Sequence, residues 1–334
     1  MIAERGRSTG DWAGRIWLVA GLLIAVYCIA RALPVIHAWD VTPGIGVDPF
    51  TDSITYLAAG ERLNAGHDLY RLGPGDRPVL IVSDTFTAPL VSPPVIAVLW
   101  RPLAALPVGQ AIWIAACWVA LLSTVVYVVA KARWIGIALT LVLMTPIAEQ
   151  LAVANAAAFF PALLILSWRL GDSPVTGAAL GLMAVIKLSP VSMLGWLVAI
   201  RARRALIAWV AAVLGLAVIG AIGAGVGSYV TYLDVAQTTN PSEWSLSALT
   251  GQPWMTYAVL VGGTVLAALT GRRPAASFML AVVASVFGSP ALYPPAMVPL
   301  LALAAPFFGV TADARGVAGW LRANARVLAP VAPT

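Results

Sequence analysis

The stretch VTGAALGLMAVIKLSPVSMLGWLVAI, residues 175–200, decides the fold, because it holds two apolar runs that are each too short to cross a membrane. The run from Val175 to Ile186 is about 18 Å long as a helix, whereas the hydrocarbon core of a bilayer is about 30 Å thick. Lys187-Leu188-Ser189-Pro190 separates the two runs. Irregular backbone at membrane depth is tolerated only where protein or a wet cavity surrounds it. We therefore expect a helical bundle in which Lys187 faces a cavity on the outer side.

The composition of the whole chain is that of an all-α polytopic membrane protein. Of its 334 residues 60% are hydrophobic and 10% charged, and the mean hydropathy is +0.90, whereas an ordinary globular domain carries about 25% charged residues. The net charge of +6 comes from basic residues spread along the chain, so we expect no nucleic-acid partner. Cys28 and Cys117 lie in apolar runs, and the two histidines, His37 and His67, form no zinc-ligand pattern.

The basic residues predict the topology, because cytoplasmic loops of membrane proteins are rich in Lys and Arg. We expect a multi-pass protein of the plasma membrane, with both termini cytoplasmic and the acidic loops outside. A single integral membrane domain would comprise a cytoplasmic tail (1–15), a first span (16–36), an outer catalytic loop with juxtamembrane helices between the first two spans (37–107), a transmembrane bundle (108–308) and a second cytoplasmic tail (309–334). Inside the bundle we expect a span at 108–130, a return at 134–151, spans at 205–226 and 254–270, an outer loop at 227–253 and a break at 288–290.

The outer loop contains a polar segment, DPFTDSITYLAAGERLNAGHDLY, residues 48–70. Asp48 followed by Pro49 predicts a helix start, and Asn64-Ala65-Gly66 predicts its end. Asp52 then lies in the first turn, on the same face as Tyr56. Asp48 is explained as the helix cap, whereas Asp52 is either a charge that complements the helix dipole or a residue with a chemical role.

Lys187 and Asp52 are the main candidates for chemistry. A lysine at membrane depth is costly unless it is paired or hydrated, so we expect Lys187 to bind an anion or to form a structural ion pair with an outer aspartate. A lipid-linked phosphate would present its head group at this depth, and Arg101 is a second candidate ligand for it. Asp52 would act as the general base that deprotonates an acceptor hydroxyl in an inverting transfer.

Five further residues are candidates for contacts to a sugar or an acceptor. Tyr56, Tyr70 and Trp244 can serve as sugar platforms, although aromatic residues also gather at membrane interfaces for physical reasons alone. Asn155 is either a helix cap or a ligand contact, and Asp48 adds a second carboxylate. The sequence firmly implies no cofactor, and it leaves open whether a divalent metal assists Asp48 and Asp52.

Several motifs occur in an order that resembles a known family. They are Asp52-x-x-x-Tyr56, Gly66-His67-Asp68-Leu69-Tyr70, Ser92-Pro93-Pro94, Arg101-Pro102-Leu103-Ala104, Ala154-Asn155 and GAALGLMAVIKLSP at 177–190. In this order they resemble the polyprenyl-phosphate-mannose-dependent α-mannosyltransferases of actinobacteria, which have the GT-C fold. The resemblance implies a GT-C-like bundle whose outer-loop aspartate is the base and whose donor is a polyprenyl-phosphate sugar. The chain departs from the family pattern at Val153, in place of a glutamine, at Ser92, in place of an aromatic residue, and near Ser289, where relatives can have a histidine.

These observations lead to one main functional hypothesis and two alternatives. The main hypothesis is a glycosyltransferase that moves a hexose, with mannose the first candidate, from the polyprenyl-phosphate donor to a glycolipid or lipoglycan of the cell envelope. A transporter or flippase of lipid-linked sugar is the first alternative, and it predicts inverted repeats, of which the sequence shows none. The second alternative is a catalytically silent membrane partner in cell-envelope assembly, for which Asp52 would lie remote from Lys187.

Overall fold

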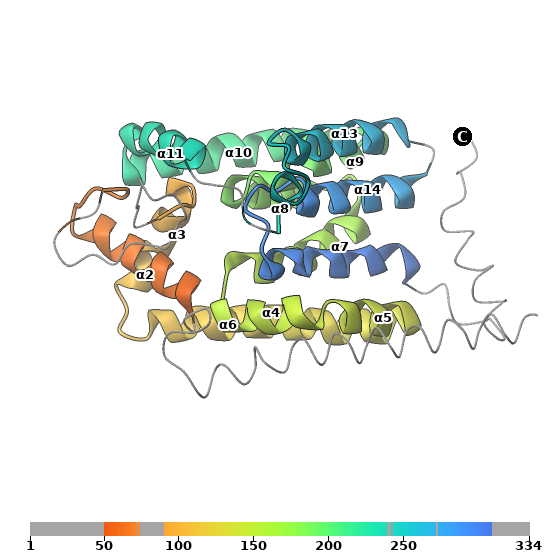
Figure 1. Cartoon of the computed structure of the whole chain (residues 1–334), viewed down its shortest axis with the longest axis horizontal. Helices are drawn as coiled ribbons and strands as arrows, with labels where there is room; N and C mark the ends of the chain where they lie inside the picture. Colours follow the sequence, from red (N-terminus) through yellow and green to blue (C-terminus); the bar gives the residue numbers. More distant parts are fainter. Residues whose placement is uncertain are drawn as a thin grey trace, which may run out of the picture.

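A computed structural model describes residues 50–71, 73, 90–238, 242, 244–271 and 273–308, and within these ranges every regular element is a helix (Figure 1). Asp48, the predicted first span at 16–36 and the two predicted cytoplasmic tails lie outside the described residues. The long helices lie side by side as a bundle (Figure 1).

Two of the described helices are long and apolar enough to cross a membrane. They are α4 (Gly109–Ala132) and α10 (Arg203–Ala224), with mean hydropathies of 2.3 and 2.6. A third span is possible if α5 (Trp134–Val142) and α6 (Met144–Val153), which are bent by 62° relative to each other, count as one. The prediction of an all-α polytopic membrane protein is confirmed, whereas the expected return helix at 134–151 is broken at Leu143.

The bundle contains two helix pairs that are interrupted where the sequence predicted a break. The first pair is α8 (Pro174–Ile186) and α9 (Met193–Ala199), joined through Lys187 and a 3₁₀ turn, η2 (Ser189–Ser192). The second pair is α14 (Pro274–Phe287) and a 3₁₀ helix, η3 (Pro294–Phe307), separated by residues 288–293. A third irregular point precedes α7 (Phe160–Leu170), where Asn155 caps the 3₁₀ turn η1 (Ala156–Phe159).

The two ends of the bundle differ in charge. Helix α4 ends at the basic residues Lys131 and Arg133, and α10 begins at another basic group, so both helices have one end in a basic region. Arg169, which ends α7, belongs to the same region, because it donates a hydrogen bond of 2.7 Å to the Tyr127 hydroxyl near the end of α4. All the described basic residues of this region are exposed: Lys131, Arg133, Arg169, Arg201, Arg203, Arg204 and Arg273. We call this region the basic end.

Helices α2 (Thr51–Asn64) and α3 (Pro94–Ala104) lie together at the opposite end (Figure 1). Arg101 of α3 donates to the carbonyl of Gly223, at the last turn of α10. Helix α2 ends as predicted, with Gly66 in the left-handed conformation at φ 74°. Its start differs from the prediction, because the helix begins at Thr51, after Asp48 and Pro49.

The segment predicted as an outer loop at 227–253 is largely helical. It contains α11 (Val226–Thr238) and the short helix α12 (Leu246–Thr250), and α13 (Met255–Leu269) follows. Gly225, at φ 82°, separates α11 from α10. The turn at Gly225 thus redirects the chain into a new helix, and the location of this segment outside the membrane stays a prediction.

Close packing of α8 on α10 explains the glycine spacing in the 177–190 motif. A Cβ atom added at Gly177 would lie 2.1 Å from the carbonyl oxygen of Ala205, and one at Gly181 would lie 2.9 Å from the Cβ of Ala212. Small residues four apart allow helix backbones to approach closely in membranes. This contact fixes α8, and therefore the position of Lys187 at its end.

Candidate active site

Asp52, Tyr56 and Asn155 form one hydrogen-bonded cluster at the α2 end of the bundle. The Nδ2 of Asn155 donates to the Oδ2 of Asp52 over 2.8 Å and lies 3.1 Å from the hydroxyl oxygen of Tyr56. Asp52 and Asn155 are half-buried, whereas Tyr56 is 3% exposed. The predicted shared face of Asp52 and Tyr56 is therefore confirmed, and both residues converge on a side chain about a hundred positions away in the sequence.

Asn155 is itself held on both sides by local structure. Its Oδ1 accepts from the Ala157 backbone N–H over 2.8 Å, which is the capping role predicted for it. Its backbone carbonyl accepts from the Nε2 of Gln150, which is fully buried, over 2.7 Å. With its Oδ1 occupied by the cap, the amide can direct only its Nδ2 toward Asp52.

A strained backbone position directly precedes α2 and so sets the position of Asp52 in its first turn. Phe50, directly before α2, has φ 63° and ψ 24°, a conformation that bulky residues rarely adopt. Its N–H donates to the Ala152 carbonyl over 2.6 Å, which ties the start of α2 to the end of α6. Such strain persists where the surrounding structure over-determines it, often at functional sites.

Aromatic rings surround Tyr56 and hold it in place. Its ring lies 6.0 Å from that of Trp100 and 6.1 Å from that of Trp113, which also packs on Phe159 at 5.4 Å. Trp113 donates its indole N–H to the Ala154 carbonyl over 2.7 Å, next to Asn155. Tyr56 therefore offers only its hydroxyl to the site, and its buried ring is not available as a sugar platform.

The electrostatics of the cluster favour a basic carboxylate. Burial raises the pKa of Asp52 above its ordinary value, while the hydrogen bond from Asn155 and the positive charge of Lys187 act in the opposite direction. Burial, and then the negative charge of Asp52, raise the pKa of Tyr56 well above its usual range, so its hydroxyl keeps its proton. A carboxylate with a raised pKa is a stronger base than an exposed one.

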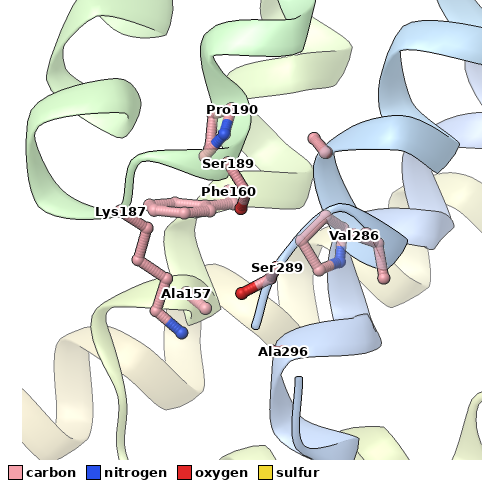
Figure 2. Close-up of a pocket in the computed structure, with 10 residues that line it drawn as sticks. Ala157, Phe160, Lys187, Ser189, Pro190, Val286, Ser289 and Ala296 are labelled. Atoms are coloured by element: carbon pink, nitrogen blue, oxygen red, sulfur yellow. The ribbon is translucent and has the colours of Figure 1, made fainter. Parts of the chain in front are cut away.

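Lys187 lines a small cavity where the three irregular points of the bundle meet. The cavity holds about 20 Å³, room for one water-sized group, and its walls come from the start of α7, the α8–η2 junction and the α14–η3 break: Ala157, Phe160, Lys187, Ser189, Pro190, Ser285, Val286, Ser289, Ala296 and Pro299. Figure 2 shows Lys187 and Ser289 reaching into this space from opposite sides. The described residues give the Lys187 ammonium no hydrogen bond or ion pair. An ammonium in such a position is energetically costly unless an anion or water stabilises its charge.

Asp52 and Lys187 belong to one electrostatic unit. The positive charge of Lys187 acts to lower the pKa of Asp52, although no direct ion pair joins these two described residues. Asn155 links the two regions, because it bonds to Asp52 and caps the turn whose Ala157 lines the Lys187 cavity.

The other described residues that were predicted for the site form no hydrogen bond to Asp52, Asn155 or Lys187. The Nε of Arg101 donates to Asn64 over 3.0 Å and a terminal nitrogen donates to Gly223, so its guanidinium joins α2, α3 and α10. Tyr70 is 2% exposed and donates its hydroxyl to the Ser92 carbonyl over 2.7 Å. Trp244 is 41% exposed. It follows two residues after Ser242, whose backbone N–H donates to the carbonyl of Pro290 in the α14–η3 break.

Three polar residues of the site were not singled out from the sequence. Ser189 and Ser289 line the Lys187 cavity, and their hydroxyls form no hydrogen bond within the described part of the chain. Gln150 donates a hydrogen bond to the backbone carbonyl of Asn155. Their sequence signal is weak, because single serines and glutamines are common near helix ends. In the described ranges no three His, Cys, Asp or Glu side chains gather as metal ligands would.

The fold and the site together define an integral membrane protein with a hydrogen-bonded cluster of Asp52, Asn155 and Tyr56 and, linked to it through Asn155, a cavity lined by Lys187. A family model described as Glycosyltransferase family 87 matches residues 91–294, more than half of the chain, so the chain belongs to this family of glycosyltransferases. The matched region includes Asn155 and Lys187, whereas Asp52 and α2 precede it. Neither the curated proteins nor the solved structures gave a match.

Proposed function

We propose that this glycosyltransferase moves a hexose, with mannose the first candidate, from a polyprenyl-phosphate donor to a glycolipid or lipoglycan. Transfer would take place at the outer face of the plasma membrane, on a GT-C-like bundle, with inversion at the sugar carbon. One observation carries the proposal: a half-buried carboxylate, oriented by Asn155, interacts electrostatically with Lys187, whose ammonium forms no ion pair with any described residue.

Asp52 would act as the general base. As the bond between the sugar carbon and the phosphate oxygen breaks, the acceptor hydroxyl attacks that carbon and Asp52 takes its proton. A single base suffices for this inverting step. Asn155 would hold the carboxylate in position, and the protonated Tyr56 hydroxyl beside it would complete the polar wall.

Lys187 would receive the donor phosphate. Its point charge stabilises the phosphate that leaves, and the hydroxyls of Ser189 and Ser289 add two donors facing the same cavity. A cavity of about 20 Å³ fits one phosphate oxygen and not the sugar. The sugar would therefore lie outside the cavity, toward Asp52, and the polyprenyl chain would stay in the lipid.

The test is transfer of radiolabelled mannose from polyprenyl-phosphate-mannose in membranes that contain the full chain. We expect Asp52→Asn to reduce transfer by about 100-fold or more, as removal of a general base does. Glu61→Gln is the matched control, because it removes a carboxylate from the exposed face of the same helix. Undiminished transfer by Asp52→Asn, or equal losses in both variants, would contradict the assignment.

A further inference from the structure

A second hollow lies at the far end of α2, away from Asp52. It holds about 440 Å³ between the segment that follows α2 and the junction of α10 with α11. Its polar walls come from His67, Asp68 and Arg71 on one side and from Ser228 and Thr231 on the other. Thr51 starts α2 beside the site and Asn64 ends it, so the hollow lies about 20 Å along the helix from Asp52.

The charged side chains of this hollow bond mainly to groups of its own wall. The Oδ1 of Asp68 accepts from the backbone N–H groups of Tyr70 and Arg71, and its Oδ2 lies 3.7 Å from the Nε of Arg71. The charges of Asp68 and Arg71 thus partly offset each other, and the guanidinium of Arg62 behind this wall donates to the backbone carbonyls of both residues. The imidazole of His67 is exposed and has no hydrogen bond to a described residue.

The donors and acceptors of the walls match a polyhydroxyl compound. Ser228 and Thr231 donate their hydroxyl protons back to the carbonyls of Ala224 and Gly227, which leaves their oxygens free to accept. His67 and Arg71 supply donors across the hollow. The space beside Gly227, which also lines the hollow, is unfilled, because a Cβ added there would meet no atom within 4 Å.

We infer that this hollow is a distal saccharide-binding subsite, which holds sugar units of the acceptor remote from the hydroxyl that reacts. The inference rests on the proposed function, because it takes Asp52 as the point of transfer. A glycan that extends from Asp52 along α2 would reach the hollow, and the enzyme would favour acceptors that already carry several sugars. The subsite would thereby set acceptor length, while Asp52 and Lys187 perform the transfer.

The test measures binding of methyl mannoside and methyl mannotrioside to the full chain in lipid nanodiscs, by saturation-transfer NMR titration. Mannosides serve as probes because mannose is the sugar of the proposed donor. We expect the trioside to bind about tenfold more tightly than the monosaccharide. Thr231→Trp, which fills the hollow, should remove this advantage, whereas Val230→Trp, at an exposed position outside the hollow on the same helix, should keep it.

Equal affinity of the wild type for both probes, or equal behaviour of the two Trp variants, would overturn the inference. An unchanged thermal unfolding profile of Thr231→Trp shows that the variant is folded. Asp52→Asn separates this inference from the proposed function, because it should lose transfer and keep the preference for the trioside. Full transfer by Asp52→Asn with that preference intact would overturn the catalytic base and leave the subsite standing.

Discussion

The basic end of the bundle and its α2 end both carry charged residues, but they hold them in different ways. At the basic end all seven described Lys and Arg residues are exposed and lie at or beside helix ends. At the α2 end Asp52 and Lys187 are half-buried, and Lys187 follows a helix of 13 residues that stops short of a full span. Under the proposed function, the exposed basic residues would orient the protein in the membrane, and the half-buried pair Asp52 and Lys187 would carry out the transfer.

The first prediction, with the largest expected effect, is that the two ends lie on opposite sides of the membrane. We expect Glu61→Cys to react with a membrane-impermeant maleimide in intact cells, whereas Arg201→Cys should react only after the membrane is opened, because Lys- and Arg-rich loops stay cytoplasmic. Both positions are exposed, and the experiment uses a chain in which the two native cysteines, Cys28 and Cys117, are replaced by Ser. Labelling of Arg201→Cys in intact cells would place the basic end outside.

The next effect concerns Asn155, which supports Asp52 at the α2 end. Asn155→Ser keeps a capping oxygen but removes the donor to Asp52, and we expect a rate loss of about 10- to 100-fold, since hydrogen bonds to charged groups contribute about 1.5–3 kcal/mol. Burial already raises the pKa of Asp52, and the Asn155 hydrogen bond lowers it. Losing that bond should therefore move the acid limb of the kcat/KM profile to higher pH.

Asn64→Ala is the matched control for this pH profile. Asn64 lies on α2 but bonds to Arg101 and not to Asp52, so its loss should leave the acid limb in place. A slower Asn155→Ser enzyme with an unchanged acid limb would mean that Asn155 supports the fold alone.

The smallest effect concerns the helix contact that carries Lys187. We expect Gly177→Val to lower the free energy of unfolding by about 1–3 kcal/mol, because its added Cβ would lie 2.1 Å from the Ala205 carbonyl oxygen. Gly215→Val on α10 is the control, since a Cβ there meets no atom within 4 Å. Denaturant titration of the purified protein measures both, and equal destabilisation would argue against close packing of α8 on α10.

The sequence predicted the parts of the fold that depend on local signals. The break at Lys187-Pro190, the break at Gly288-Pro290 and the helix end at Gly66 were all predicted, because proline, glycine and the length of apolar runs act locally. The start of α2 was placed too early, because the Phe50 backbone depends on a hydrogen bond to Ala152, a contact between distant segments.

The site could be predicted only as separate residues. Asp52, Asn155 and Lys187 were each identified from local chemistry, but nothing local shows that Asn155 donates to Asp52 or that Ser289 shares a cavity with Lys187. Arg101 was named as a second candidate ligand for the phosphate, and nothing local shows that its guanidinium bonds to Asn64 and Gly223. Such pairings arise when the tertiary fold joins segments far apart in sequence.

The central claim is that Asp52 and Lys187 serve one transfer step. A double-mutant cycle on the rate of mannose transfer from polyprenyl-phosphate-mannose tests it, with Asp52→Asn, Lys187→Met and the double variant. Residues that act as a unit are not additive, so we predict that the double variant loses about as much activity as the worse single variant. Losses that multiply, each variant acting independently of the other, would contradict the claim.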